Sequence, residues 1–297
     1  MTATDPMIGS PSPAALTLIL SIIAFGMIPP SAESQILNSG QVPRTSGSSG
    51  TGLPKIVAPT RPRTVYTRYP WKLSIVATIF WIGEDPSQNN PTPNNKSSWD
   101  GEWEKNYGGY DDPDPKARTA DFCPIGFVPQ ENPFYIALPY NDVAAWNKTK
   151  PEAARVIPWF RQRFTEPGKT VLENQWVAIR YKGRICYAQW EDCGPFNTQD
   201  YKYVFGNARP MNTKNNGAGI DVSPAVRDCL RMPSGAKVDW RFVDLSEVTH
   251  GPWCKYGRNN DFAQNQSRKA FEQQKRLDEL KRMRDEWFRN KRQPQSL

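Results

Sequence analysis

Alternating and clustered apolar residues predict short β-strands in the middle of the chain. The run 73–82 is β-branched and aromatic and is bounded by Pro70 and Gly83, which is typical of a strand. Four further strand-like runs follow, at 134–139, 175–181, 184–190 and 237–243. Loops rather than regular helices separate most of these runs. The pattern therefore predicts an all-β fold, and a barrel with short helical insertions is the simplest architecture.

Two segments have the features of α-helices. Ser223 can accept hydrogen bonds from the free N–H groups of a helix start, and Pro224 suits the first helical position, so we expect a helix to about Arg231. Residues 270–291 are rich in Glu, Lys, Arg and Gln, with apolar residues at intervals of three and four, which predicts an amphipathic helix. These apolar residues are Leu277, Leu280, Met283 and Trp287.

The charge of this C-terminal helix leaves two interpretations open. Residues 268–292 contain ten basic and five acidic residues, a net charge of +5. The helix, within a basic tail at 256–297, could dock on an anionic surface or a protein partner. It could equally be a solvated helix that lies on the domain or frays from it.

The N-terminal region has the composition of a targeting segment and a linker. The apolar run 14–28 is followed by small residues and prolines, so residues 1–33 resemble a secretory signal, and we expect a secreted or periplasmic protein. No Lys or Arg precedes Arg44, so the positive region of a secretory signal is missing, and an uncleaved anchor or a disordered apolar tail is the alternative. Residues 34–65 are rich in Ser, Gly and Pro and predict a flexible linker to a domain at 66–255.

Composition and charge limit the classes of partner. With 38% hydrophobic residues, 28 Pro and 20 Gly, the chain supports one domain with tails. The net charge of +8 favours an acidic partner, such as an anionic wall polymer or a lipid surface. No nucleic-acid-binding motif accompanies the charge, so a specific nucleic-acid partner is not expected.

Five cysteines are consistent with an oxidising compartment, where at most two disulfides could form. Cys186 and Cys193 are not expected to pair, because seven residues of strand span about 23 Å and bridged Cα atoms lie within about 7 Å. No C-x-x-C is present and His250 is the only histidine, so neither a metal nor another cofactor is predicted. We interpret Asp111, Asp112 and Asp114 as turn formers rather than calcium ligands.

Two aspartates stand at loop positions beside predicted elements. Asp192 precedes a Gly-Pro turn, and Asp221 precedes the helix start at Ser223. A carboxyl group beside apolar walls has a raised pKa and can protonate a glycosidic oxygen near neutral pH, so Asp221 and then Asp192 are the catalytic candidates. Each also has a structural interpretation. Asp221 could accept hydrogen bonds from loop N–H groups, and Asp192 could stabilise the Gly-Pro turn through hydrogen bonds to the backbone.

Aromatic side chains could provide stacking surfaces for sugar rings, since each pairs an apolar face with polar edges. Aromatic residues in strands belong more often to the core, and burial is expected above all for Trp190. The loop residues Trp99 and Trp103 are the better candidates. The full set of predicted contacts comprises Trp99, Trp103, Glu102, Tyr135, Tyr140 and Trp190, with Trp81 and Tyr110 as further stacking candidates.

Several of these segments resemble one known family. Residues 177–181 and 185–190 match its central strands, 192–196 match its Asp-Arg-Gly-Pro-Phe loop, and 220–225 match its Ile-Asp-Leu-Ser helix start. Residues 137–139 fit its Leu-Pro segment. The region from Val76 to Val243 thus resembles the six-stranded double-psi β-barrel of the rare lipoprotein A type, related in fold to expansins and barwin.

The resemblance implies that both aspartates reach one groove that faces a cell-wall glycan. Enzymes of the family cleave peptidoglycan strands as lytic transglycosylases, with Asp221 at the position of the acid, and such an enzyme can work with one carboxyl group because a sugar hydroxyl attacks. Expansin-like relatives bind polysaccharide without hydrolysis, so a non-catalytic binding or scaffolding module is the alternative. A protease-inhibitor or defence-like binding barrel is a third class.

The sequence departs from the family pattern at three places. Tyr135 stands where the wall-cleaving members have a His before the Leu-Pro segment, and Cys193 replaces the Arg of the Asp-Arg-Gly-Pro loop. Glu102 or Glu104 matches the family's Gly-Glu segment only loosely. The loss of the His bears on catalysis rather than on the fold.

Overall fold

The structure is a computed structural model and describes residues 68–87 and 90–292. The predicted signal-like segment at 1–33 and linker at 34–65 lie outside the described residues. Within the described ranges, no helix is both long enough and apolar enough to cross a membrane.

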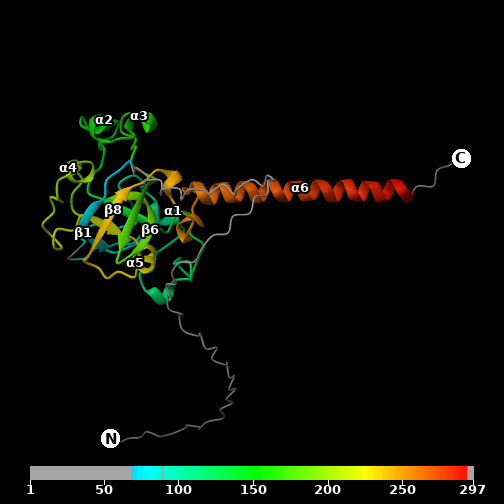
Figure 1. Cartoon of the computed structure of the whole chain (residues 1–297), viewed down its shortest axis with the longest axis horizontal. Coiled ribbons are helices and arrows are strands. Elements are labelled where there is room, and N and C mark those ends of the chain that lie inside the picture. The colour runs from blue at the N-terminus through cyan, green and yellow to red at the C-terminus, as the bar shows by residue number, and fades with distance from the viewer. Residues whose placement is uncertain (1–67, 88–89, 293–297) are drawn as a thin grey trace, which may run out of the picture. The chain divides into compact units, whose positions relative to one another are not determined.

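Six strands close into a barrel, with the order β1-β7-β2-β6-β5-β8 around it. Figure 1 labels β1, β6 and β8 of this barrel. The strands of the barrel are β1 (Lys72–Ile79), β2 (Tyr135–Leu138), β5 (Gln175–Tyr181), β6 (Arg184–Cys193), β7 (Ile220–Val222) and β8 (Ala236–Phe242). A two-stranded sheet, β3 (Val143–Ala145) with β4 (Lys148–Thr149), lies in the insertion after β2. The prediction of an all-β, six-stranded barrel is confirmed.

Two sets of three strands interleave in this barrel. β1, β2 and β5 are the first three barrel strands along the chain and form the first half of the barrel, and β6, β7 and β8 form the second half. The first strand of each half pairs in parallel with the second strand of the other, β1 with β7 and β6 with β2. The remaining pairs, including β2 with β7 and β5 with β8, are antiparallel. Strands far apart in the sequence are therefore direct neighbours.

Alternate residues of each strand face opposite sides of the barrel wall. In β2, Ile136 and Leu138 are fully buried in the main core, together with Trp190 of β6 and Trp240 of β8. Residues on the other side of β2 pack outside the barrel in a second cluster. This outer cluster comprises Phe80, Ile82, Trp103, Tyr107, Tyr135 and Ala137. The loop between β1 and β2 thus covers part of the outer wall.

A buried ion pair holds this long loop. The Arg118 guanidinium donates to Asp111 at 2.7 Å, and their side chains are 2% and 0% exposed. The Tyr135 hydroxyl of β2 also donates to Asp111, at 2.7 Å, and accepts the backbone N–H of Ile82. The interpretation of Asp111 as a simple turn former is therefore wrong, because its carboxyl group joins the loop to the barrel.

The helices are short, except for the last one. They are α1 (Trp103–Tyr107), α2 (Ala153–Val156), α3 (Phe160–Arg163), α4 (Tyr201–Val204), α5 (Pro224–Leu230) and α6 (Asp261–Arg292), with 3-10 turns at Pro115–Ala117, Leu245–Glu247 and Pro252–Cys254. The predicted start of α5 is confirmed, because the Ser223 hydroxyl accepts the N–H of Val226 and Pro224 occupies the first turn. The C-terminal helix is also confirmed and begins nine residues earlier than predicted.

The five cysteines are free thiols in the structure, so the predicted disulfides are not found. The Cys193 thiol contacts the Tyr140 carbonyl at 3.2 Å, within hydrogen-bonding distance for sulfur. Burial raises the pKa of Cys186 well above its ordinary value, and its hydrogen bond with Cys229 adds to this effect. Cys186 and Cys193 belong to the same strand, β6, and do not pair.

Candidate functional site

Four paired residues on four neighbouring strands form a row along the barrel wall, and this row brings the two aspartates to one face. Thr78 of β1 pairs with Asp221 of β7, Asp221 pairs with Ala137 of β2, and Ala137 pairs with Asp192 of β6. Directly paired residues of neighbouring strands point to the same side of a sheet. Asp221 and Asp192 are therefore separated only by the small side chain of Ala137, with backbones about 10 Å apart across two strand spacings.

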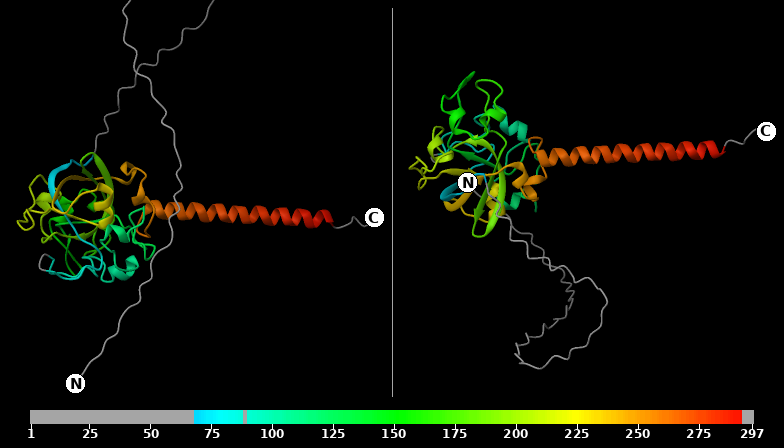
Figure 2. Two further views of the ribbon diagram at one scale, coloured as in Figure 1. Left: turned by 90° about the horizontal axis from the view of Figure 1, so that it is seen from below. Right: turned by 45° about the horizontal axis from the view of Figure 1, so that its top comes forward.

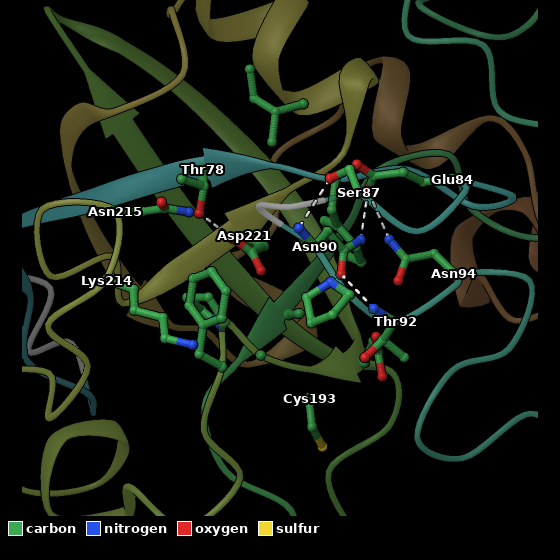
Figure 3. Close-up of a pocket in the computed structure, with 18 of the residues that line it drawn as sticks. Thr78, Glu84, Ser87, Asn90, Thr92, Asn94, Cys193, Lys214, Asn215 and Asp221 are labelled. Atoms are coloured by element: carbon green, nitrogen blue, oxygen red, sulfur yellow. Dashed lines mark hydrogen bonds between the residues drawn. The ribbon is translucent and has the colours of Figure 1, made fainter.

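A groove with a volume of about 1160 Å³ opens over this row. Its walls come from the end of β1, the loop after β1, the turn after β6 and the loop before β7. Figure 3 shows Asp221 near the middle, with Glu84 and Asn94 on one side and Lys214 and Asn215 on the other. The polar or aromatic lining includes Thr78, Glu84, Asn90, Asn94, Ser98, Asp192, Phe196, Lys214, Asn215 and Asp221.

Asp221 has the electrostatics of a proton donor. Burial raises the pKa of its carboxyl group from 3.8 to about 7, and the negative charges of Asp192 and Glu84 contribute to the rise. The Thr78 hydroxyl donates a hydrogen bond to Asp221, and this bond lowers the pKa of the carboxyl group. Gly194 lies against this carboxyl group, since a Cβ built on it would be 3.4 Å from Asp221 Oδ2. The site therefore holds a carboxyl group that is about half protonated near neutral pH.

Asp192 is held in place by the β1–β2 loop. Its Oδ1 accepts the backbone N–H of Ser98 at 2.7 Å. Burial raises the pKa of Asp192, and this hydrogen bond lowers it in part. The neighbouring carboxyl group of Glu191 is buried and accepts from the Asn259 side chain. Glu191 does not line the groove.

Glu84 is a third carboxyl group of the groove and was missed in the sequence. It follows the predicted first strand, with no motif around it. Its Oε2 accepts from the amide groups of Asn90 at 3.1 Å and Asn94 at 2.9 Å. Burial raises the pKa of Glu84, whereas these two hydrogen bonds lower it. Only the folded loop brings this carboxyl group within electrostatic reach of Asp221.

One exposed aromatic ring lines the groove, and it belongs to Phe196. The ring is 43% exposed, and its backbone adopts a left-handed conformation with φ of 56°, which is uncommon for residues other than glycine. The Lys214 ammonium group lies 5.3 Å from the ring centroid. Figure 3 shows Lys214 on the side of the groove away from Glu84, and the Phe196 ring lies beside this lysine.

Most of the aromatic residues predicted as stacking surfaces lie elsewhere. Trp103, Tyr135, Tyr140 and Trp190 are at most 2% exposed, so their rings are unavailable to a glycan in this structure. Each fills the core or the outer cluster, where an aromatic ring removes more apolar surface from water than it would in the groove.

The remaining predicted contacts also lie outside the groove lining. Trp99 is partly buried, with its ring 5.9 Å from that of Trp190. Glu102 is exposed and forms an ion pair with Lys105 at 3.0 Å. Trp81 donates to the Tyr110 hydroxyl at the surface. The sequence presents Phe196 only as the last residue of the 192–196 motif, and its position directly after the Gly194-Pro195 turn is the one signal that could identify it.

In the described part of the chain, no cluster of His, Cys, Asp and Glu side chains is arranged to hold a metal ion. The groove chemistry available is that of three carboxyl groups, several amide and hydroxyl groups, one thiol and the two lysines Lys96 and Lys214. No protein-family model and no curated protein sequence matches this chain.

Proposed function

We propose that this chain is an exported, cell-wall-directed double-psi β-barrel that cleaves glycan strands in the manner of a lytic transglycosylase. The observation that carries the proposal is Asp221, a carboxyl group with a pKa of about 7 inside an open groove. A group with this pKa can both give and take a proton at neutral pH. Asp192 lies on the same face of the wall.

The strand pairing supports the double-psi assignment. In such a barrel, each half of the chain threads its first strand beside the second strand of the other half. The parallel pairs β1–β7 and β2–β6, flanking the antiparallel pair β2–β7, have this arrangement. The proposal also takes its substrate class from the motifs around Asp192 and Asp221, which resemble those of wall-directed barrels.

The proposed reaction needs one group that both gives and takes a proton. Protonated Asp221 donates to the glycosidic oxygen as the bond from that oxygen to the anomeric carbon breaks. A hydroxyl group of the same sugar then attacks the anomeric carbon, and its proton returns to Asp221. The Asp192 carboxylate stabilises the positive charge that develops on the sugar ring. No water is consumed, so the product is an internal anhydro sugar.

A specific observation favours a non-catalytic alternative. Tyr135, at the position of the family's histidine, is buried, and its hydroxyl bonds to Asp111 and Ile82 rather than facing the groove. A groove without that histidine could bind a glycan through Phe196, Lys214 and the amide groups alone. This module would be expansin-like and would bind or loosen polysaccharide without cutting it.

Incubation of the purified protein with peptidoglycan sacculi distinguishes the two functions. We expect soluble anhydro-muropeptides from the wild type, a loss of at least about 100-fold in rate for Asp221→Asn, and no loss for Glu102→Gln, a carboxyl-to-amide change outside the groove. Release unaffected by Asp221→Asn would remove Asp221 as the acid. Pull-down with sacculi without release of products would establish the binding module. If the protein neither binds sacculi nor releases products, both functions are rejected. Export is tested by N-terminal sequencing of the mature chain, which should begin near residues 33–35.

A further inference from the structure

Helix α6 presents a long side with no partner in the described part of the chain. Its first turn packs on the barrel, where Ala263 is buried and the Phe262 ring lies 5.7 Å from that of Trp176. From Gln264 through Lys291 every residue is exposed. The helix extends away from the barrel in every view (Figures 1 and 2). The apolar residues of α6 beyond Ala263 therefore contribute no packing to the barrel.

Most of the apolar residues of α6 beyond Ala263 gather on one side, whereas Phe271, which is 72% exposed, lies on the opposite side. At about 100° per residue, six of them share an arc of about 140°. The five of these side chains that are larger than alanine are 45% to 65% exposed. We call this arc the apolar stripe, and it consists of Ala270, Leu277, Leu280, Met283, Trp287 and Phe288.

Charged residues are sorted by sign around the apolar stripe. Five basic residues lie within about 75° of its centre, whereas all acidic residues after residue 268 lie more than about 100° away. The Lys291 ammonium group lies 4.3 Å from the Trp287 ring centroid. The basic set is Lys269, Arg276, Lys281, Arg284 and Lys291, and the acidic set is Glu272, Asp278, Glu279, Asp285 and Glu286.

This distribution decides between the kinds of partner. Two copies of α6 joined through their apolar stripes would place this basic set of one copy against that of the other, and like charges in those positions oppose pairing. The phosphates of a nucleic acid would pair with this basic set, but Trp287 and Phe288 would then lie against a charged backbone. An anionic lipid surface offers both an apolar layer and negative headgroups.

We propose that α6 binds the surface of an anionic lipid membrane, lying in its plane with the apolar stripe among the acyl chains nearest the headgroups. The 32 residues of α6 form a rod about 48 Å long, so the contact is extended. The Lys and Arg residues of the basic set, most of which lie among the apolar residues of the stripe, lay their aliphatic stems along it while their charged ends reach the phosphates. This contact holds the barrel at the membrane whatever its groove binds.

The test uses the full chain and vesicles of phosphatidylcholine, alone or mixed with phosphatidylglycerol, in a co-sedimentation assay. One triple variant, the stripe-side variant, removes three basic residues on the side of the stripe, Lys269→Gln, Arg276→Gln and Lys291→Gln. The matched control removes three from the opposite side, Lys275→Gln, Arg282→Gln and Arg289→Gln. Both change the net charge equally, and none of the six residues forms an ion pair in the described part of the chain.

We expect the wild type to bind the anionic vesicles selectively. The stripe-side variant should lose about tenfold or more in affinity, and the control should lose less than about threefold. Leu280→Gln should also weaken binding, with the helix content by circular dichroism unchanged. Equal losses in the two triple variants, no binding to anionic vesicles, or tighter binding to an acidic protein or nucleic acid than to lipid would each overturn the proposal.

Discussion

At the scale of the residue, the protonation of Asp221 makes the stability of the protein depend on pH. Burial and two nearby carboxylates raise its pKa from 3.8 to about 7, so the folded protein retains a proton that the unfolded chain releases at lower pH. Between these two values the native state binds more protons than the unfolded state. The contribution of Asp221 to stability is therefore complete below about pH 4 and is lost as the pH rises through about 7.

Replacing Asp221 by Asn should remove this pH dependence. The amide cannot ionise, and its oxygen can still accept from Thr78. The free energy of unfolding of Asp221→Asn, relative to the wild type, should therefore rise by about 1–3 kcal/mol between about pH 5 and about pH 8. Urea denaturation at a series of pH values measures this difference. A difference that stays constant across the series would show that the pKa of Asp221 is not raised.

At the scale of the element, the loop between β1 and β2 builds one wall of the groove and depends on a buried ion pair. The Asp111 and Arg118 side chains are withdrawn from water and bonded at 2.7 Å. Tyr135 connects the same carboxyl group to β2. An apolar pair in this place would be about as stable as the ion pair, but loss of Asp111 leaves the buried Arg118 with only Asp228, at 3.9 Å, as a charged partner.

The substitution Asp111→Asn should therefore destabilise the protein by about 3–5 kcal/mol. The matched control is Asp121→Asn, which breaks the exposed ion pair with Lys255 at 2.7 Å. That change should cost no more than about 1 kcal/mol, because solvent screens the pair. Both values follow from urea denaturation monitored by tryptophan fluorescence. Similar costs for the two variants would contradict the structural role of the buried pair.

The elements differ in how far local sequence predicts them. The strands β5 and β6 are predicted well, because their apolar runs flank a Lys-Gly turn. The strand β7 was read only as a helix start, since three residues carry no periodicity. It becomes a strand because β1 and β2 pair with it on both sides. Tertiary hydrogen bonding, rather than propensity, makes this element.

At the scale of the whole molecule, the barrel and most of α6 are structurally independent. Beyond Ala263 the helix buries no side chain against the barrel. Deletion of residues 267–297 should therefore change the thermal midpoint of the barrel by less than about 2 °C, which corresponds to at most about 1 kcal/mol. Differential scanning calorimetry measures the midpoint. A large decrease would show that α6 contributes to the barrel fold.

The sequence by itself determined the all-β class, the positions of most strands, the start of α5 and the amphipathic C-terminal helix, because each depends on local pattern or local hydrogen bonding. It also singled out Asp192 and Asp221. Only the tertiary structure decided their surroundings, since burial and pairing involve strands from both halves of the chain. Long-range packing placed Glu84 and Phe196 in the groove and sent Trp103 and Tyr135 to the interior.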